Sequence, residues 1–236
     1  RLTKEETAGM NVLVIGAGRG LGRVLSIMLA KRGHQVIAGV RRKETAALDN
    51  FKYDNIMVCQ TDVVNEKILS ETALELKNKN ITLNAVVQTA GVLMASDREK
   101  NLLEADVYDF KTAFEVNVLG IVLAFRAFYP MMEKGGIYIA QTSEGGCFCG
   151  GGAVFPAYGI TKTAANKTVQ TLRSTVDDVN IIAMHPGRMN TDMGRTTAQI
   201  EPEEAAAGIC EILEGKRTLR DDEWFVDYLG RKMPLQ

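Results

Sequence analysis

The chain has 236 residues, of which 46% are hydrophobic and 24% charged, and its 28 basic and 29 acidic side chains leave a formal net charge of -1. This composition is that of an ordinary soluble globular protein, and the length suits one large α/β domain. Near-neutral charge without a long basic block argues against a nucleic-acid partner and against a basic membrane-surface helix. The polar start lacks the apolar stretch of a secretory leader, and four cysteines are too few for a disulfide scaffold. We therefore expect a cytoplasmic protein with reduced thiols and no membrane or metal partner.

Strand-like and helix-like patterns alternate along the chain. The apolar, β-branched run at 11–15 predicts a strand buried on both faces. Apolar residues then recur at three- and four-residue steps over 21–32, which predicts a helix with Gly33 at its C-cap. One long helix is predicted over 105–134, fraying near Pro130. Further strands are predicted at 35–39, 56–59, 84–88, 136–140 and 180–184, with helices in most of the gaps.

This alternation predicts a doubly wound α/β fold, with a parallel sheet, right-handed crossovers and helices on both faces. No repeat or composition shift marks a linker, so residues 10–236 are interpreted as a single domain of the Rossmann type. Residues 1–9 are interpreted as a loose tail or a vector-derived remnant, because Met10 directly precedes the first strand.

A glycine-rich turn follows the first strand and opens the first helix. Glycines there allow a pyrophosphate to approach the backbone at the positive end of the helix. The strict G-x-G-x-x-G fingerprint fails at Leu21, whereas Gly16, Gly20 and Gly22 fit G-x-x-x-G-x-G. The alternative is a plain turn that needs glycine for steric reasons only. The candidate dinucleotide-binding residues of this turn are Gly16, Gly18, Arg19, Gly20, Leu21 and Gly22.

The residues after the second strand bear on the choice of cofactor. An acidic side chain there would hold the ribose 2′-hydroxyl of NAD, but the strand opens onto Arg41, Arg42 and Lys43. Paired arginines favour a 2′-phosphate, and Arg19 is a second candidate contact from the glycine turn. NADP is therefore predicted rather than NAD, the alternative being that Arg41 and Arg42 form a solvated turn.

Tyr158 and Lys162 lie one helical turn apart, on the same face of a predicted helix. A neighbouring cation lowers the pKa of a phenol, which would make Tyr158 a usable proton donor to a carbonyl oxygen. Tyr228 and Lys232 share this spacing but have Gly230 between them and no cofactor strand before them, so they are interpreted as packing or surface. Ser143 follows a strand at the sheet edge where such folds bind ligands, and its hydroxyl could orient the substrate carbonyl.

Together these motifs resemble the short-chain dehydrogenase/reductase family over nearly the whole chain, and the closing pattern is similar to its C-factor and Sniffer-like carbonyl reductase branch. The resemblance implies a catalytic tetrad of Asn117, Ser143, Tyr158 and Lys162. It also implies that Lys162 holds the nicotinamide ribose and that Asn117 positions a water in the proton relay. The further cofactor contacts that it implies are Asp62 and Val63 at the adenine, Ala90 and Gly91 after the fourth strand, and Pro186, Gly187 and Thr191 at the nicotinamide.

Some positions depart from the family pattern or stay open. Ile15 replaces a threonine, and Gln88-Thr89 replaces two asparagines, so the hydrogen bonds of the loop must differ there. Ser143 lies 15 residues before Tyr158, and Thr142 is the alternative catalytic hydroxyl. Cys147 and Cys149 lack the further ligands of a zinc site and are interpreted as small side chains bordering the pocket.

The predicted function is an NADP(H)-dependent oxidoreductase that interconverts a carbonyl and an alcohol. A dinucleotide-binding regulatory protein without turnover is the alternative, since a fold alone cannot exclude it. A homodimer or homotetramer is expected from the family resemblance. Substrate specificity is assigned to the segments 92–101, 147–155 and 190–200, which carry no recognisable code.

Overall fold

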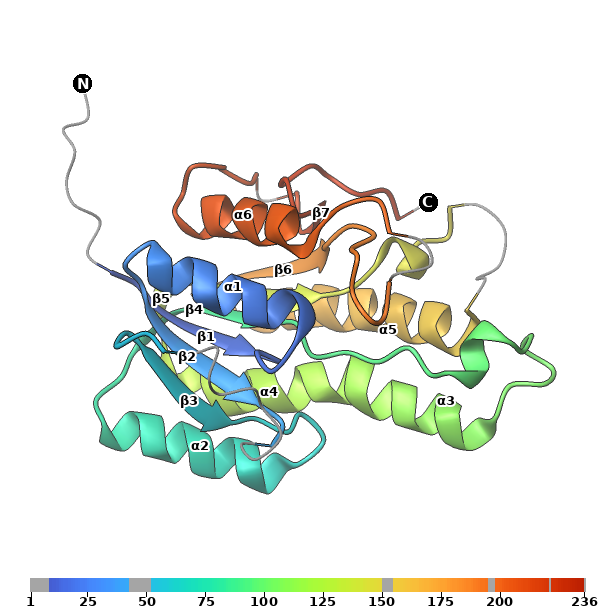
Figure 1. Ribbon diagram of the computed structural model, residues 1–236, viewed down its shortest axis with the longest axis horizontal. Helices are drawn as coiled ribbons and strands as arrows, with labels where there is room; N and C mark the ends of the chain where they lie inside the picture. Colours follow the sequence, from blue (N-terminus) through green and yellow to red (C-terminus); the bar gives the residue numbers. More distant parts are fainter. Residues whose placement is uncertain (1–8, 43–51, 150–154, 195–197, 221, 236) are drawn as a thin grey trace.

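The computed structural model describes residues 9–42, 52–149, 155–194, 198–220 and 222–235 (Figure 1). The predicted tail, apart from Gly9, lies outside the described residues, as does Lys43. Parts of two predicted specificity segments, 150–154 and 195–197, also lie outside them.

A seven-stranded parallel sheet forms the centre of the molecule, in the order β3-β2-β1-β4-β5-β6-β7. The order reverses between β1 and β4, so the carboxyl ends of these two strands define the switch point at which such sheets bind ligands. The predicted doubly wound fold is thus confirmed. The strands are β1 (Asn11–Ile15), β2 (Gln35–Val40), β3 (Ile56–Gln60), β4 (Leu83–Gln88), β5 (Met132–Gln141), β6 (Asn180–His185) and β7 (Phe225–Asp227).

Helices cover both faces of the sheet (Figure 1). On one face α1 and α6 pack through Leu25, Leu29 and Ile209, and on the other α2, α4 and α5 pack through Leu76, Phe128 and similar apolar residues. The helices are α1 (Gly20–Lys31), α2 (Glu66–Asn78), α3 (Val107–Phe114), α4 (Gly120–Phe128), α5 (Pro156–Arg173) and α6 (Pro202–Leu213), with short turns η3 (Ser96–Arg98), η4 (Glu115–Leu119), η5 (Tyr129–Met131) and η6 (Glu144–Gly146).

The ends of the first helix agree with the sequence prediction to within one residue. It ends at Lys31, and Gly33 follows with φ of +89° while its N–H donates to the carbonyl of Ala30 at 3.0 Å. Because L side chains rarely adopt that φ, glycine is the residue that suits this helix end.

The predicted long helix is confirmed from Val107 to Met131, with an irregular last turn at Pro130, but its extension to 134 was wrong. It consists of α3, a π-helical turn η4, α4 and the short turn η5, and the chain then enters strand β5 at Met132. Met132 pairs with Leu83, and the register shifts before Ile137 pairs with Ala85, so a strand with an irregularity replaces the last helical turn. By length and composition alone, Val107–Met131 is apolar enough to cross a membrane. Here, however, Ile121, Phe125 and Phe128 are buried against the sheet.

Candidate active site

A cleft of about 1130 Å³ lies at the carboxyl ends of the strands, over the switch point between β1 and β4. Its walls come from segments far apart in the chain: the glycine turn, the ends of β2, β3 and β4, and the loops that follow β4 and β6. Among the predicted cofactor residues, those that line it are Gly16, Gly18, Arg19, Gly20, Leu21, Gly22, Arg41, Arg42, Asp62, Val63, Ala90, Gly91 and Thr191.

The glycine turn is built so that two glycines close it and a third faces open space. A Cβ on Gly22 would lie 2.3 Å from the carbonyl oxygen of Gly16, and one on Gly16 would lie 2.8 Å from the nitrogen of Ala90. A Cβ on Gly18 would meet only a methyl group of Val40, at 3.8 Å. The turn therefore presents its backbone to the cleft at Gly18, as a bound diphosphate requires.

The start of α1 carries the positive end of the helix dipole, which attracts an anion. Its N-cap residue, Arg19, makes no side-chain capping bond, and no acidic residue lies in the first turn. The positive end of the helix dipole is therefore uncompensated where it borders the cleft.

The end of the cleft beside β2 is basic. Arg41 and Arg42 follow the strand directly, are exposed, and line the cleft together with Arg19. Asp62, after β3, also lines it, and its carboxylate accepts a hydrogen bond from the N–H of Val64 at 3.3 Å. Among the described residues, the one acidic group after β2 or β3 that lines the cleft is thus engaged with its own turn.

The departures at Ile15, Gln88 and Thr89 produce a local hydrogen-bond arrangement of their own. The hydroxyl of Thr89 donates to the carbonyl of Ile15 at 3.0 Å and joins the ends of β1 and β4 below the glycine turn. Gln88 accepts a hydrogen bond from the buried hydroxyl of Tyr138.

None of the four predicted catalytic residues is among those that line the cleft, but Lys162 contacts its lining at Gln141 and Asn117 contacts it at Val92. Ser143 and Tyr158 lie together beside Lys162. Ser143 follows β5 and caps the η6 turn, where its Oγ accepts from the N–H of Gly145 at 3.1 Å. A hydrogen bond with Ser143 lowers the pKa of Tyr158, but burial raises it by more, and Glu144 adds a further increase. The phenol thus titrates above its usual range, so it is protonated at neutral pH.

Thr142 does not share this position. It is completely buried, and among the described residues its hydroxyl has no hydrogen-bond partner. Of the two hydroxyls left open by the sequence, Ser143 is the one in contact with Tyr158.

Lys162 is a buried cation on the same helix as Tyr158. Its Nζ donates to the backbone carbonyl of Gln141 at 2.9 Å and lies 5.5 Å from the centre of the Tyr158 ring. Burial lowers the pKa of Lys162 to about 8. The predicted proximity of the two groups is confirmed, whereas the expected fall in the phenol's pKa is not, because desolvation dominates at both residues.

Asn117 lies in the π-helical turn η4 and holds a cleft wall through its side chain. Its Nδ2 donates to the carbonyl of Val92 and its Oδ1 accepts from the N–H of Val92, both at 2.9 Å, while Nδ2 also contacts the hydroxyl of Thr161 at 3.1 Å. The amide is therefore fully engaged in joining the segment after β4 to α5.

The segment after β6 is placed in part as predicted. Thr191 lines the cleft next to the glycine turn, with its methyl 3.7 Å from the position of a Cβ on Gly20. Pro186 is buried, and Gly187 has φ of +86° and packs against Ile200. Neither of these two lines the cleft, so they act as backbone supports for the loop that carries Thr191.

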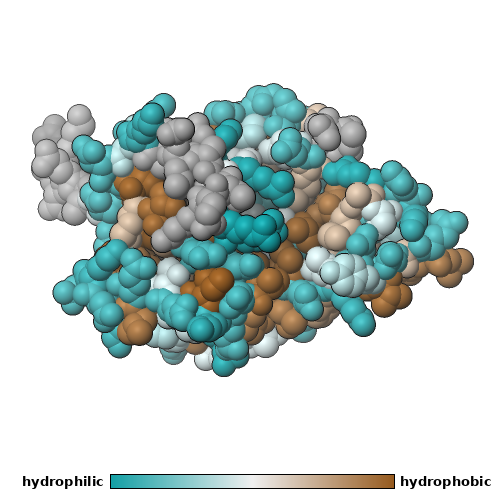
Figure 2. Space-filling view, turned by 60° about the horizontal axis from the view of Figure 1, so that its bottom comes forward, coloured by the Kyte–Doolittle hydropathy of each residue, from teal (hydrophilic) through white to brown (hydrophobic). Residues whose placement is uncertain are grey.

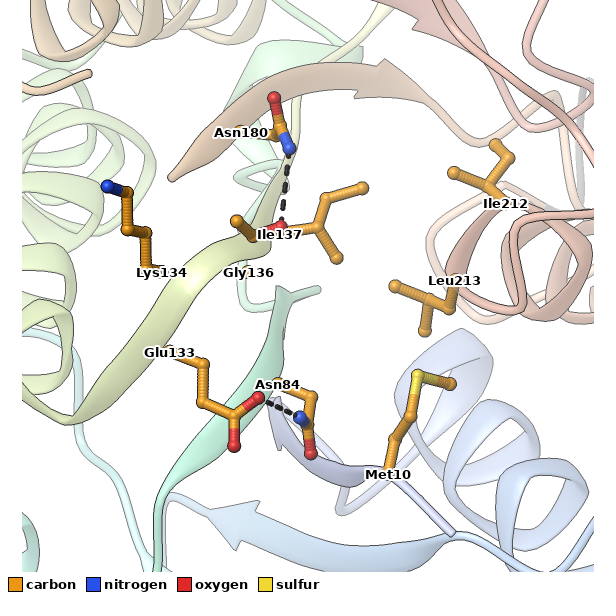
Figure 3. Close-up of a pocket in the computed structure, with 10 residues that line it drawn as sticks. Met10, Asn84, Glu133, Lys134, Gly136, Ile137, Asn180, Ile212 and Leu213 are labelled. Carbon is orange, nitrogen blue, oxygen red and sulfur yellow. Dashed lines mark hydrogen bonds between the residues drawn. The ribbon is translucent and has the colours of Figure 1, made fainter. Parts of the chain in front are cut away.

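A second pocket, of about 330 Å³, lies at the opposite edge of the sheet, at the amino ends of the strands (Figure 3). Asn84 donates to Glu133 at 2.6 Å there, and Asn180 donates to Gly135 at 3.4 Å. Its polar groups thus bond to one another, and none of the candidate catalytic residues lines it. The described residues contain no group of three or more His, Cys, Asp or Glu that could hold a metal ion.

Sequence reasoning missed two features of the site. Lys162 is anchored by a backbone carbonyl, that of Gln141, which no side-chain pattern can reveal. Arg98 lines the cleft, with its guanidinium over the ring of Phe155 at 5.6 Å, yet it lies in a polar loop without a recognisable motif.

A switch-point cleft with a glycine turn, and a Ser, Tyr and Lys cluster that contacts the cleft lining at Gln141 and Gly91, are typical of a dinucleotide-binding α/β oxidoreductase. The chain belongs to the short-chain dehydrogenase family, whose model matches residues 10–202.

Known relatives agree with this membership. An NADPH-dependent pterin aldehyde reductase from Arabidopsis thaliana is 29% identical over 192 residues, which cover 79% of this chain and 77% of that protein. A carbonyl reductase from Pseudomonas aeruginosa PAO1, crystallised with NADP, is 25% identical with a TM-score of 0.81 and covers 96% of this chain and 99% of its own. The carbonyl reductase Sniffer of D. melanogaster shares the fold at 20% identity, with a TM-score of 0.83 and coverage of 96% and 99%.

Proposed function

We propose that the protein is an NADP(H)-dependent oxidoreductase that moves hydride between the nicotinamide and a carbonyl or alcohol substrate. The observation that carries this proposal is the contact between Ser143 and Tyr158 beside a buried Lys162, whose Nζ contacts the cleft lining at Gln141 and Gly91. A regulatory protein that only bound the cofactor would need the cleft but not this cluster.

The residues present fit NADP(H). Gly18 leaves backbone open to a diphosphate, the start of α1 is uncompensated, and basic side chains stand where a 2′-phosphate would lie. That phosphate would be bound by Arg41, Arg42 and Arg19. The adenine would lie beside Asp62 and Val63, and the rest of the dinucleotide would lie along Ala90, Gly91 and Thr191. When bound, the cofactor supplies the hydride, and the rest of the chemistry belongs to the chain.

The chain's own residues bind the carbonyl and deliver the proton. Ser143 donates a hydrogen bond to the substrate oxygen and fixes it beside Tyr158. Tyr158, protonated at neutral pH, donates its phenolic proton to that oxygen as negative charge develops there. Lys162 stabilises the phenolate that remains, and its ammonium borders Gly91, where a ribose hydroxyl would be held. Asn117 holds the backbone of Val92, which lines the cleft.

Cofactor preference is tested by fluorescence titration with NADPH and NADH. We expect NADPH to bind at least about tenfold more tightly, because each charge-assisted contact to a phosphate contributes roughly 1.5–3 kcal/mol. The double variant R41A/R42A should lose that preference while it still binds NADH. Equal affinities for the two cofactors in the unmodified protein would rule out the NADP assignment.

Turnover is tested with NADPH and a panel of aldehydes and ketones. Oxidation of NADPH with at least one member is the expected result, and tight binding without any oxidation would favour the regulatory alternative. We further propose a cytoplasmic location, which fractionation of cells that express the protein would check.

We also propose that the protein is a homodimer or homotetramer. The residues that support this are exposed apolar side chains on and around α3, with one on α5: Leu103, Val107, Tyr108, Phe114, Leu119 and Ile160. Figure 2 shows hydrophobic residues that interrupt the hydrophilic surface on the side of the molecule that it presents. Exposed apolar patches are typical of protein interfaces.

A further inference from the structure

The short turn η3, which follows β4, contacts three elements of the cleft through three consecutive side chains. Ser96 donates a hydrogen bond to Asp109 of α3. Asp97 accepts hydrogen bonds from the first turn of α5. Arg98 donates to the carbonyl of Met193, in the loop after β6, and lies over the ring of Phe155. The turn η3 therefore connects α5, which carries Tyr158, to α3 and to the loop after β6.

The first turn of α5 has no capping side chain of its own. Its N-cap residue is Phe155, whose side chain makes no capping hydrogen bond, and the first helical residue, Pro156, has no N–H. The N–H of Gly159 donates to the carbonyl of Phe155 at 2.8 Å. Ala157 and Tyr158 are left as the two N–H groups that need an acceptor from elsewhere.

Asp97 supplies both acceptors from 60 residues away. Its Oδ1 accepts from the N–H of Ala157 at 2.8 Å, and its Oδ2 accepts from the N–H of Tyr158 at 2.7 Å. The carboxylate is 4% exposed, so these bonds form where water competes little. Charge-assisted bonds of this length at a helix N-terminus are among the stronger hydrogen bonds in proteins.

We propose that Asp97 is a positioning residue for catalysis, which fixes the backbone of Tyr158 so that its phenol meets Ser143 and the substrate oxygen. The proposal rests on the proposed function, since it concerns the same proton donor. Asp97 touches neither substrate nor cofactor in this role and acts only through Tyr158. Without its carboxylate, the two N–H groups lose their partners and the first turn of α5 can shift, which moves the phenol from its aligned position.

The decisive experiment compares D97A with a matched control, D106A. Asp106 also caps a helix, α3, with its carboxylate accepting from the N–H of Tyr108 at 2.8 Å, but it does not line the cleft. Because a displacement of about 1 Å at the reacting groups can cost roughly 100-fold in rate, D97A should lose about that factor in kcat. Its affinity for NADPH, measured by fluorescence, should stay within about twofold, and D106A should keep kcat within about twofold. A D97A variant with the kcat of D106A would overturn the proposal.

A second variant guards against misfolding of D97A. D97N keeps the size of the side chain and one acceptor oxygen, but its NH2 group places a donor against the second N–H, so the variant should fold and still lose roughly tenfold or more in kcat. If D97N folds and keeps the kcat of the unmodified protein, paired acceptance by the two carboxylate oxygens is not what Asp97 contributes, and the proposal fails.

Hydrogen exchange tests the contact without turnover. The amides of Ala157 and Tyr158 should exchange faster in D97A than in the unmodified protein, while those of α3 should not. If none of the carbonyl compounds supports oxidation of NADPH by the unmodified protein, the proposed function fails. The positioning of Tyr158 is then judged by hydrogen exchange alone. Unchanged exchange at both amides would refute it.

Discussion

Tyr158 and Lys162 show how burial, rather than their mutual attraction, determines the ionisation of the two groups. Burial favours the neutral form of each, so it raises the pKa of the phenol and lowers that of the ammonium, to about 8 for Lys162. The phenol therefore carries its proton at neutral pH, and the lysine is close to its titration range. Both properties suit a site that donates a proton and then stabilises the anion left behind.

Replacement of the phenol tests the proton donor directly. Y158F should lower kcat by roughly 10²- to 10⁴-fold, because a positioned general acid contributes that much. NADPH affinity should change little, since the cofactor contacts come mainly from other segments. Steady-state kinetics and a fluorescence titration on the same preparation check both statements. Appreciable turnover by Y158F would remove Tyr158 from its assigned role.

Removal of the two neighbouring hydroxyls should have different effects on kcat. S143A should lower kcat, because the hydroxyl that contacts Tyr158 is lost. T142V should keep kcat and be at least as stable, since it replaces a buried hydroxyl that has no partner among the described residues. Kinetics and thermal unfolding of both variants decide the question. The opposite pattern, with activity lost only in T142V, would make Thr142 the catalytic hydroxyl.

The buried ammonium of Lys162 should weaken the folded state below about pH 8. The folded pKa of about 8 lies below the ordinary value of 10.5, so the destabilisation is fully present below pH 8 and is lost as the pH rises toward 10.5. The free energy of unfolding of K162M relative to the unmodified protein should therefore fall by about 2 kcal/mol between about pH 7 and about pH 10. Urea unfolding at both pH values measures this difference. A difference that does not change with pH would contradict the lowered pKa.

At the scale of elements, the effect of a substitution in the glycine turn on stability and cofactor affinity depends on which glycine is altered. In G22A the new Cβ would lie 2.3 Å from a backbone oxygen of Gly16, so the turn must open. We expect a lower melting temperature and a loss of cofactor affinity, as backbone displacement removes the diphosphate contacts. G18A is the matched control for folding, because its Cβ has no contact closer than 3.8 Å, and it should melt like the unmodified protein. Equal melting temperatures for the two variants would show that the turn is not packed as described.

The strands and the first helix were predictable because each has one periodicity and clear end signals. The run at 11–15 has no polar residue after Asn11, and Gly33 marks the end of α1. The end of α4 was not predictable, since the residues from Met131 to Lys134 suit a helix as well as the start of β5. Met132 pairs with Leu83 of β4, and this pairing places it in the strand. β7 was missed because a strand of three residues carries too little pattern.

The candidate site was predictable where motifs carry it and not where partners are distant in sequence. Tyr158 and Lys162 share a helix, so their spacing alone brings them together. Asp97 gave no signal, because an acidic residue in a polar loop is ordinary and its role depends on where α5 begins. Ser143 and Thr142 could not be distinguished, since the sequence does not show which side chain faces the sheet interior.

At the scale of the whole molecule, the apolar face on α3 should determine assembly. Val107 is 68% exposed on that face, and V107D would place a charge in the proposed interface. Light scattering should give a multiple of 25.8 kDa for the unmodified protein and a lower mass for V107D. L74D is the control, because Leu74 is 58% exposed but lies on α2. A monomeric unmodified protein, or equal effects of the two variants, would exclude this interface.

Three of the four candidate catalytic residues, all except Tyr158, are anchored by main-chain atoms. Lys162 donates to the carbonyl of Gln141, Asn117 bonds to both peptide groups of Val92, and Ser143 accepts from the N–H of Gly145. No substitution at position 141 can delete the carbonyl partner, and at position 92 only proline would remove the N–H. The positions of Lys162 and Asn117 are therefore insulated from side-chain changes at these neighbours, whereas the position of Tyr158 depends on the side chain of Asp97. The cleft wall at 92 and 141 can thus acquire new side chains for new substrates without moving the lysine or the asparagine.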